Sequence, residues 1–394
     1  MVFIVDSHPV QYKAPVYQEL ARLREGGFKV LYATDCSVRG HRDAGFGQKV
    51  AWDIPLLEGY PHVILGNERG EPLAGFRSLT GRGIGALLRR ERPEAVLISQ
   101  FLYEADLVTY IWCHFLGIPV WIRHETQDEA FVRPGWKSAL RRVVYRLIYR
   151  GVDHAFYIGE LNREHLIASG MAPGRMSRAA YCVRTRLDGM SDAEKQRIRD
   201  TLRGEHSVAA DEVLLLFSGK LIEKKNPRLI LEAMELLTPG ELGRFKVLYV
   251  GSGAMEDELR EMAGRFAGRV EFAGFVNQSR MHEYYLAADV LILPSRRAGE
   301  TWGLVVNEAL HAGCGVVMTD AVGCHREFGG WERVRVIGEG NAVECANALR
   351  ELSGYARSFD WCAARMENYS VHAAAEALAE ALDKAGGAGK DALA

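Results

Sequence analysis

Two glutamates, Glu300 and Glu308, lie eight residues apart in the segment GETWGLVVNEAL, which spans residues 299–310. The strand-like run DVLIL precedes this segment, and a helical pattern begins at about Leu304, so Glu300 falls in a loop and Glu308 one turn into a helix. A carboxylate that accepts two hydroxyl hydrogen bonds suits a ribose cis-diol at Glu308, whereas Glu300 suits a sugar ring on which charge develops. The alternative is an ordinary pair of surface glutamates.

The start of the predicted helix is a candidate site for a diphosphate. Backbone N–H groups in the first turn of a helix have no intrahelical acceptor, and the helix dipole favours an anion there. A glycine at this point would let the backbone approach the ligand closely. We therefore expect four consecutive residues to contact phosphate: Trp302, Gly303, Leu304 and Val305.

The segment resembles the E-x7-E signature of the retaining glycosyltransferases of family 4, which have the GT-B fold of two facing Rossmann-like domains. Three further segments of the same half resemble that family in the same order: FSGKLIEKKNP its donor-phosphate loop, VGSG its nucleotide-pocket turn, and GFVNQSRMHEYYLAADVLILPS its base-binding loop with the following helix and strand. The resemblance implies nucleotide contacts at Gly219, Gly251, Gly253, Val276 and Asn277.

The same resemblance implies that two basic residues, Lys220 and Lys225, hold the diphosphate and act in catalysis together with Glu300. In that family the first of these positions is usually arginine. Lys220 supplies charge but not the bidentate fork of an arginine, so Lys224, next to Lys225 in the chain, is an alternative contact for the diphosphate. Fixed cations stabilise a departing nucleoside diphosphate without a metal. The chain has no D-x-D pair, so we expect no metal and no cofactor, with a UDP- or GDP-sugar as donor substrate.

The first half of the sequence carries fewer chemical signals. His124 ends the strand-like run PVWIRH and matches by position a catalytic histidine beside the donor sugar in the resembling family. The carboxyl end of a parallel strand faces the ligand crevice, although a structural histidine is the alternative. The loop after the first strand lacks the glycine-rich turn of many relatives, so His8, Gln11 and Tyr12 are candidates for acceptor contacts.

Strand-like runs alternate with amphipathic helical segments in both halves, which predicts an α/β protein with two parallel-sheet, Rossmann-like domains and a ligand cleft between them. We expect Trp361 and Leu378 to dock across the domain boundary. The predicted parts are an acceptor-binding domain (1–184), a donor domain (185–355), C-terminal helices that pack across to the first domain (356–385) and a disordered tail (386–394).

Composition limits the partners and the compartment. The formal net charge of −2 gives no global reason to expect nucleic-acid binding. Seven scattered cysteines without a C-x-x-C pair, and a start without signal-peptide features, indicate a reducing cytoplasm. The segment 133–150 has six Lys or Arg, no acid and one apolar face, so it is either a helix lying peripherally on the inner face of the cell membrane or an ordinary helix with a solvated basic face.

The resemblance implies transfer of a sugar, with retention of configuration, from a UDP- or GDP-sugar to a hydroxyl acceptor, expected to be a glycan or a lipid-linked glycan. Two alternatives stay open. A sugar-nucleotide epimerase on the same scaffold would need its own acid and base pair in the cleft. A non-catalytic subunit of glycan biosynthesis would not need Glu300, Glu308 and Lys225, which are all present.

Overall fold

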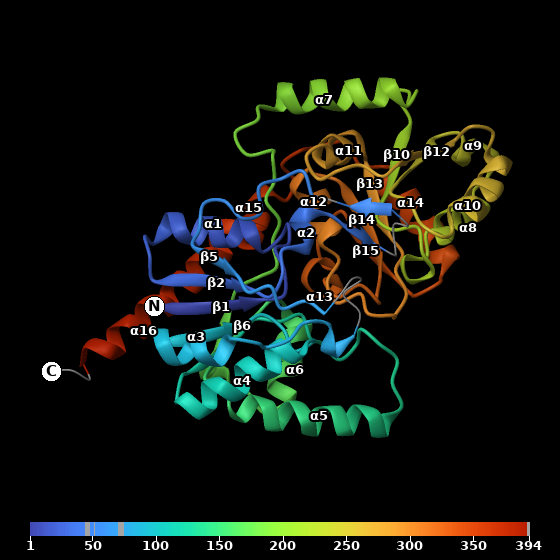
Figure 1. Cartoon of the computed structure of the whole chain (residues 1–394). Coiled ribbons are helices and arrows are strands. Elements are labelled where there is room, and N and C mark those ends of the chain that lie inside the picture. Colours follow the sequence, from blue (N-terminus) through green and yellow to red (C-terminus); the bar gives the residue numbers. More distant parts are fainter. Residues whose placement is uncertain (44–47, 51, 70–74, 392–394) are drawn as a thin grey trace.

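The computed structural model describes residues 1–43, 48–50, 52–69 and 75–391. Figure 1 shows two α/β halves, each built on its own sheet. The N-terminal sheet has the order β5-β2-β1-β6-β7-β8-β9, and the C-terminal sheet has the order β12-β11-β10-β13-β14-β15. All neighbouring strands within these two sheets pair in parallel. The prediction of two parallel-sheet Rossmann-like domains is confirmed.

The N-terminal sheet consists of β1 (Val2–Asp6), β2 (Phe28–Tyr32), β5 (His62–Ile64), β6 (Ala95–Ile98), β7 (Val120–Ile122), β8 (His154–Tyr157) and β9 (Met176–Arg178), while β3 (His41–Asp43) pairs antiparallel with β4 (Gln48–Val50). Its helices are α1 (Ala14–Leu23), α2 (Cys36–Arg39), α3 (Ile84–Glu91), α4 (Glu104–Leu116), α5 (Gly135–Arg150) and α6 (Glu160–Ala168), with 3₁₀ turns η1 (Phe76–Ser78) and η2 (Pro173–Arg175).

The C-terminal sheet consists of β10 (Val213–Ser218), β11 (Phe245–Val250), β12 (Val270–Gly274), β13 (Val290–Leu293), β14 (Gly315–Thr319) and β15 (Val334–Ile337). Its helices are α7 (Asp192–Glu205), α8 (Arg228–Met234), α9 (Pro239–Leu242), α10 (Glu256–Ala263), α11 (Met281–Ala287), α12 (Leu304–His311), α13 (His325–Phe328), α14 (Ala342–Leu352) and α15 (Ala363–Met366). A further helix, α16 (Val371–Asp391), follows α15 and packs on the N-terminal half. The 3₁₀ turns are η3 (Glu223–Lys225), η4 (Gly264–Phe266) and η5 (Glu367–Tyr369).

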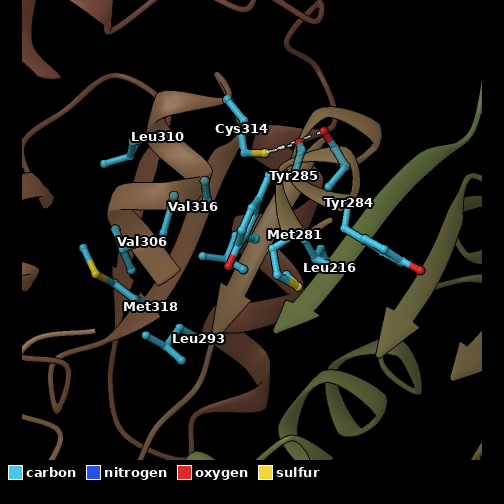
Figure 2. Close-up of a cluster of buried hydrophobic side chains, with 14 of the residues drawn as sticks. Leu216, Met281, Tyr284, Tyr285, Leu293, Val306, Leu310, Cys314, Val316 and Met318 are labelled. Atoms are coloured by element: carbon cyan, nitrogen blue, oxygen red, sulfur yellow. Dashed lines mark hydrogen bonds between the residues drawn. The ribbon is translucent and has the colours of Figure 1, made fainter. Parts of the chain in front are cut away.

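Helices cover both faces of each sheet, so the central strands are buried on both sides and read as continuous apolar runs. Side chains alternate along β10: Leu214 and Leu216 join one core cluster, while Leu215 and Phe217 join the other. Figure 2 shows the first of these clusters, in which α11 and α12 pack on the sheet and the Cys314 thiol donates to the Tyr285 carbonyl at 3.0 Å. This packing fixes α12, which carries Glu308.

The chain passes between the halves twice. Residues 179–191 connect β9 to α7, and α7 packs on α11 of the C-terminal half. The helix α16 returns and packs on α1, where Leu378 joins the N-terminal core (Figure 1). Trp361 does not cross, because its indole N–H donates to Gly313 O at 3.1 Å within the C-terminal half. α16 continues to Asp391, so residues 386–391 of the expected tail are helical, and residues 392–394 lie outside the described residues.

Candidate active site

A cleft of about 310 Å³ lies between the two halves, at the carboxyl ends of β10 and β11 and the start of α12. This is the position at which open parallel sheets bind ligands. Its N-terminal wall comes from the loop after β1, from residues 52–56 and from the connection at 183–187. The predicted residues that line it are Gln11, Tyr12, Gly219, Gly251, Val276, Leu304, Val305 and Glu308.

Glu308 presents a fixed carboxylate to this cleft. The Tyr285 hydroxyl donates to one of its oxygens at 2.6 Å, and the Gln278 amide donates to the other at 2.7 Å. Burial raises the pKa of Glu308, and the two hydrogen bonds offset only part of that rise. Each carboxylate oxygen retains capacity to accept a further hydrogen bond, so the group can bind a pair of hydroxyls.

Glu300 is buried beside the cleft, with 7% of its surface exposed. Its carboxylate accepts from Lys225 Nζ at 2.5 Å and from Ser295 Oγ at 3.2 Å. Burial by itself would raise the pKa of Glu300, but the charges of Lys225 and Lys224 and the hydrogen bonds from Lys225 and Ser295 outweigh it, so the net pKa is lowered. Glu300 is therefore ionised and already paired with a cation.

The lysines of η3 both converge on the loop that carries Glu300. Lys224 Nζ donates to Gly299 O at 2.8 Å, and burial lowers the pKa of Lys224. Lys220 follows Gly219 directly at the end of β10 and is half-buried. An ammonium group has three donors, so Lys225 can hold Glu300 and still donate to a phosphate oxygen.

The glycines of the site are required for packing. Gly303, the residue before α12, has φ +101°, and a Cβ there would lie 2.7 Å from Val322 Cγ1 and 2.9 Å from Leu293 Cδ2. Gly303 therefore lets the start of α12 pack closely on the core. Close approach of a ligand at Gly303 stays a prediction. A Cβ on Gly251 (φ +130°) would lie 1.9 Å from Gly219 O.

Gly253 and the Trp302 side chain are held in packing contacts within the protein. A Cβ on Gly253 would lie 2.4 Å from Leu221 O, so this glycine lets two loops touch. The Trp302 ring is buried, and its indole N–H donates to Asn307 Oδ1 at 2.8 Å, which leaves only its backbone for a ligand. The first hydrogen bond within α12 runs from Val306 N to Gly303 O at 2.9 Å, so the N–H groups of Leu304 and Val305 precede it and belong to the open helix start.

His124 points into the N-terminal half and is absent from the residues that line the cleft. Its Nδ1 accepts from Thr126 N at 3.3 Å, and its Nε2 lies 2.9 Å from the Tyr149 hydroxyl, which also contacts His165 Nε2 at 3.0 Å. Burial lowers the pKa of His124 to about 3, so the imidazole is neutral. This is the environment of the structural histidine that we named as the alternative.

The next residue, Glu125, turns toward the C-terminal half, and sequence reasoning missed it. Its carboxylate accepts from Thr301 Oγ1 at 2.7 Å and from the Tyr12 hydroxyl at 3.2 Å. Thr301 is the neighbour of Glu300 in the chain, so Glu125 joins the two halves beside the site. Its position shortly after β7 could have indicated this. Successive side chains of an extended segment point to opposite sides, so His124 and Glu125 cannot both face the same half.

Residues 125–131, which we call the strap, pair with the Glu300 loop. Gly299 N donates to Ala130 O at 2.7 Å, and Phe131 forms an antiparallel bridge with Ala298. Gly299 has φ +98°, and a Cβ there would lie 2.5 Å from the Phe131 ring. The loop that carries Glu300 is thus held from the N-terminal half as well as by Lys224 and Lys225.

Two further predicted residues, His8 and Asn277, do not line the cleft. His8 Nδ1 lies 3.0 Å from Ser7 Oγ, and His8 is not a lining residue of the cleft. Asn277 Oδ1 accepts from Gln278 N at 2.9 Å and so shapes the turn that presents Gln278 to Glu308. Within the described ranges, no group of three or more His, Cys, Asp or Glu side chains is placed to hold a metal ion.

Comparison with known proteins places each half in a family. The Glycosyl transferases group 1 model matches residues 198–354, and the Glycosyl transferase 4-like domain model matches residues 14–181. The chain is 34% identical to the phosphatidyl-myo-inositol mannosyltransferase of Mycolicibacterium smegmatis over 139 residues, and this aligned segment is 34% of each of the two proteins. Over 118 residues it is 35% identical to an uncharacterized glycosyltransferase of Methanocaldococcus jannaschii, which covers 29% of each. The chain thus matches about a third of the length of these relatives.

The fold is also that of a solved structure. Anabaena Alr3699/HepE in complex with UDP superposes with a TM-score of 0.71 and 15% identity, over 97% of this chain and 99% of that chain. The likeness extends over both halves, as the two family models do. The chain therefore joins a glycosyl transferase 4-like domain, residues 14–181, to a domain of the glycosyl transferases group 1 family, residues 198–354, on a GT-B fold.

Proposed function

We propose that this protein transfers a glycosyl group from a UDP- or GDP-sugar to a hydroxyl acceptor, with retention of configuration and without a metal ion. The observation that carries the proposal is the pair of carboxylates around the start of α12: Glu308, fixed by Tyr285 and Gln278, and Glu300, paired with Lys225. The UDP bound by Anabaena HepE supports a nucleoside diphosphate as the ligand class.

In this proposal Glu308 binds the ribose. A buried carboxylate pays a desolvation cost that is offset only when good donors surround it. Tyr285 and Gln278 supply one donor to each oxygen, and the two ribose hydroxyls supply the others. The diphosphate then lies over the N–H groups of Leu304 and Val305, at the positive end of the α12 dipole.

Glu300 and the lysines act on the bond that breaks. As the glycosidic bond lengthens, the sugar gains positive charge and the diphosphate gains negative charge. Glu300 stabilises the sugar, whereas Lys225, Lys220 and Lys224 stabilise the leaving diphosphate. A phosphate oxygen of the donor takes the acceptor proton on the same face of the sugar, and for this reason the mechanism needs no separate general base.

The acceptor occupies the N-terminal wall of the cleft, at Gln11 and Tyr12. We propose that it is a glycan or a lipid-linked glycan; the name of the Mycolicibacterium smegmatis relative specifies a phosphatidyl-myo-inositol acceptor and supports the lipid-linked class. All seven cysteines are buried free thiols, which supports a reducing compartment such as the cytoplasm.

The test is a thermal-shift series with UDP, GDP, ADP and their sugars, followed by product analysis of the donor that stabilises most. Binding at 100 times Kd would add about 2.7 kcal/mol to the free energy of unfolding, which is several degrees in Tm. A glycosyltransferase releases the nucleoside diphosphate and a new glycoside of retained configuration. Interconversion of sugar nucleotides would indicate an epimerase, and binding without turnover toward any acceptor would indicate a non-catalytic subunit.

A further inference from the structure

A second cavity, of about 240 Å³, lies in the C-terminal half at the amino ends of β10, β13 and β14. This is the edge of the sheet opposite the cleft, because the strands are parallel and the cleft lies at their carboxyl ends. We call this space the arginine cavity. Its charged lining, among the described residues, consists of the arginines Arg199, Arg244, Arg333 and Arg357 and the acids Asp211, Glu212 and Asp289.

Two of these acids are already neutralised by cations. Asp289 accepts from Arg199 at 2.5 Å and from Arg203 at 3.0 Å, and Glu212 accepts from Arg269 at 3.1 Å. The other three arginines of the cavity form no salt bridge within the described part of the chain. The cavity therefore has cations that lack a carboxylate partner.

Arg244 and Arg333 use few of their hydrogen-bond donors. Arg244 Nη2 donates to Ser353 O at 3.3 Å, and Arg333 Nη1 donates to Ala356 O at 2.7 Å. A guanidinium group has five N–H donors, so one carbonyl leaves several donors in each side chain. The Arg333 guanidinium also lies over the Tyr355 ring, 5.1 Å from its centroid, which restricts its orientation. Both side chains can therefore bind a further acceptor.

Arg357 is held by main-chain carbonyls rather than by a carboxylate. Its guanidinium donates to Ala312 O at 2.6 Å and to Gly313 O. Burial lowers the pKa of Arg357, and the charge of Arg199 adds to that lowering. The Nε–H groups of Arg357 and Arg333 are buried and have no acceptor among the described residues. A buried donor without an acceptor is costly, so an anion beside these groups would be stabilising.

Helix capping is the alternative role for these arginines. The carbonyl groups at the C-terminal ends of α11 and α12 carry partial negative charge, and cations are favourable there. Arg199 donates to Ala287 O at 2.6 Å and Arg357 donates to Ala312 O, so capping explains these two side chains. It does not explain Arg333, whose acceptor Ala356 O lies in the loop between α14 and α15.

We propose that the arginine cavity binds an anion that carries a phosphate group. Planar guanidinium groups donate paired hydrogen bonds to phosphoryl oxygens. A phosphoryl group presents three acceptor oxygens, so it can bind Arg244, Arg333 and Arg357 at the same time. A carboxylate has only two oxygens and fits this set of arginines less well. Asp211, which is exposed at the cavity, opposes the anion and limits its affinity.

The experiment is a calorimetric titration of the full chain with inorganic phosphate. Arg244→Gln and Arg333→Gln should each weaken binding roughly tenfold, because each removes a charge-assisted hydrogen bond. Arg244→Lys should weaken binding less than Arg244→Gln, since it keeps the charge. Asp211→Asn should strengthen binding about two- to threefold, which a purely structural role of the arginines would not produce. Thermal unfolding of each variant checks that it is folded.

Two controls separate this cavity from other cations of the protein. Lys225→Gln removes a cation from the cleft and should leave phosphate binding at the cavity unchanged. Arg265→Gln removes the same charge as Arg244→Gln, from a side chain that is 69% exposed and does not line the cavity. It should also leave binding unchanged. Neither the titration nor its controls rest on the proposed function, because they need neither donor nor turnover.

A parallel titration with glucose 6-phosphate identifies the source of the phosphate group. Tighter binding than that of inorganic phosphate would indicate a phosphorylated metabolite, and equal binding would indicate phosphate itself. Three results would overturn the proposal: no binding of either probe to the wild-type chain, loss of binding in Lys225→Gln but not in Arg244→Gln, or equal losses in Arg244→Gln and Arg265→Gln.

Discussion

The two halves of the molecule build their sides of the cleft differently. In the C-terminal half, the groups that face the cleft follow strands β10, β11 and β12 and the start of α12 in simple order along the sequence. In the N-terminal half, the expected histidine is buried against Tyr149, and its neighbour Glu125 instead accepts a hydrogen bond from Thr301 of the C-terminal half. Two consecutive residues therefore point in opposite directions: His124 packs in the core of its own half, and Glu125 contacts the other half beside Glu300.

This difference reflects how each half constrains its side chains. In the proposed phosphate site, the backbone N–H groups at the start of α12 have positions that follow from the local strand-loop-helix path. The acceptor side uses side chains, whose direction depends on what the other half presents. The hydrogen bond from Thr301 Oγ1 holds the Glu125 carboxylate beside Glu300. The comparison predicts that mutations in the C-terminal half act on binding and chemistry, and those at the strap act on alignment.

The largest expected effect is that of Glu300→Gln. The isosteric change keeps the volume but removes the charge that faces the sugar, and turnover should fall roughly 100- to 1,000-fold. Nucleotide affinity, measured by calorimetry, should stay within a few-fold of wild type. The matched control is Glu332→Gln, which changes an exposed glutamate that does not line the cleft. It should leave turnover and nucleotide affinity unchanged. A turnover that survives Glu300→Gln would remove this residue from the chemistry.

Glu308→Ala should act on binding rather than on turnover. Loss of two charge-assisted hydrogen bonds to the ribose should weaken the nucleotide by about 1.5–3 kcal/mol, roughly 10- to 150-fold in Kd. Tyr285→Phe, which removes one donor that orients Glu308, should have a smaller effect in the same direction. Calorimetry of the nucleoside diphosphate checks both. Equal Kd values in all three proteins would contradict the ribose assignment.

The interdomain contact between Glu125 and Thr301 should have a moderate effect. Thr301→Val removes the donor of the hydrogen bond at 2.7 Å, and Glu125→Gln removes the charge of its acceptor. Each should lower turnover about 5- to 10-fold at nearly constant nucleotide affinity. A double-mutant cycle should give a coupling of about 1 kcal/mol.

His124→Asn tests the acceptor half directly. In the buried network around Tyr149 the change should lower Tm more than it lowers turnover of the folded enzyme. If turnover falls sharply at an unchanged Tm, His124 has the catalytic role that the family resemblance implies. The inference that His124 is structural and Glu125 contacts the site would then be wrong.

The smallest expected effect is a pH dependence of nucleotide affinity. Burial raises the pKa of Glu308, so protonation begins at a higher pH than in an ordinary glutamate. The protonated group loses acceptor capacity for the ribose, and the affinity should therefore fall a few-fold as the pH is lowered from neutral. Glu308→Gln removes this titration while the phosphates of the ligand still ionise. A pH profile that is the same in both proteins would rule out Glu308 as its source.

Much of the fold could be predicted from hydrophobic patterning. Ten runs with strong β-branched or aromatic character predict strands that the structure contains: VFIVD (β1), FKVLYAT (β2), EAVLIS (β6), PVWIRH (β7), HAFYIG (β8), VLLLFSG (β10), FKVLYVG (β11), RVEFAGF (β12), DVLILPS (β13) and GVVMTD (β14). Three of the missed strands, β5, β9 and β15, lie at sheet edges, where one side is open and the apolar pattern is weaker. The other two, β3 and β4, form a separate antiparallel pair of three residues each. Trp361 was misplaced because an amphipathic segment does not specify which half supplies its partner.

The sequence by itself determined the two parallel sheets, the loop and helix start at 299–310 and the positions of Glu300 and Glu308 within them. These are local properties, because hydrophobic period, glycines and helix starts depend on neighbours in the chain. Only the tertiary structure decided that Lys225 pairs with Glu300, that Tyr285 and Gln278 hold Glu308, and that Glu125 contacts Thr301 of the other half. These contacts join residues from different loops, and only the packing of the two halves brings them within hydrogen-bonding distance.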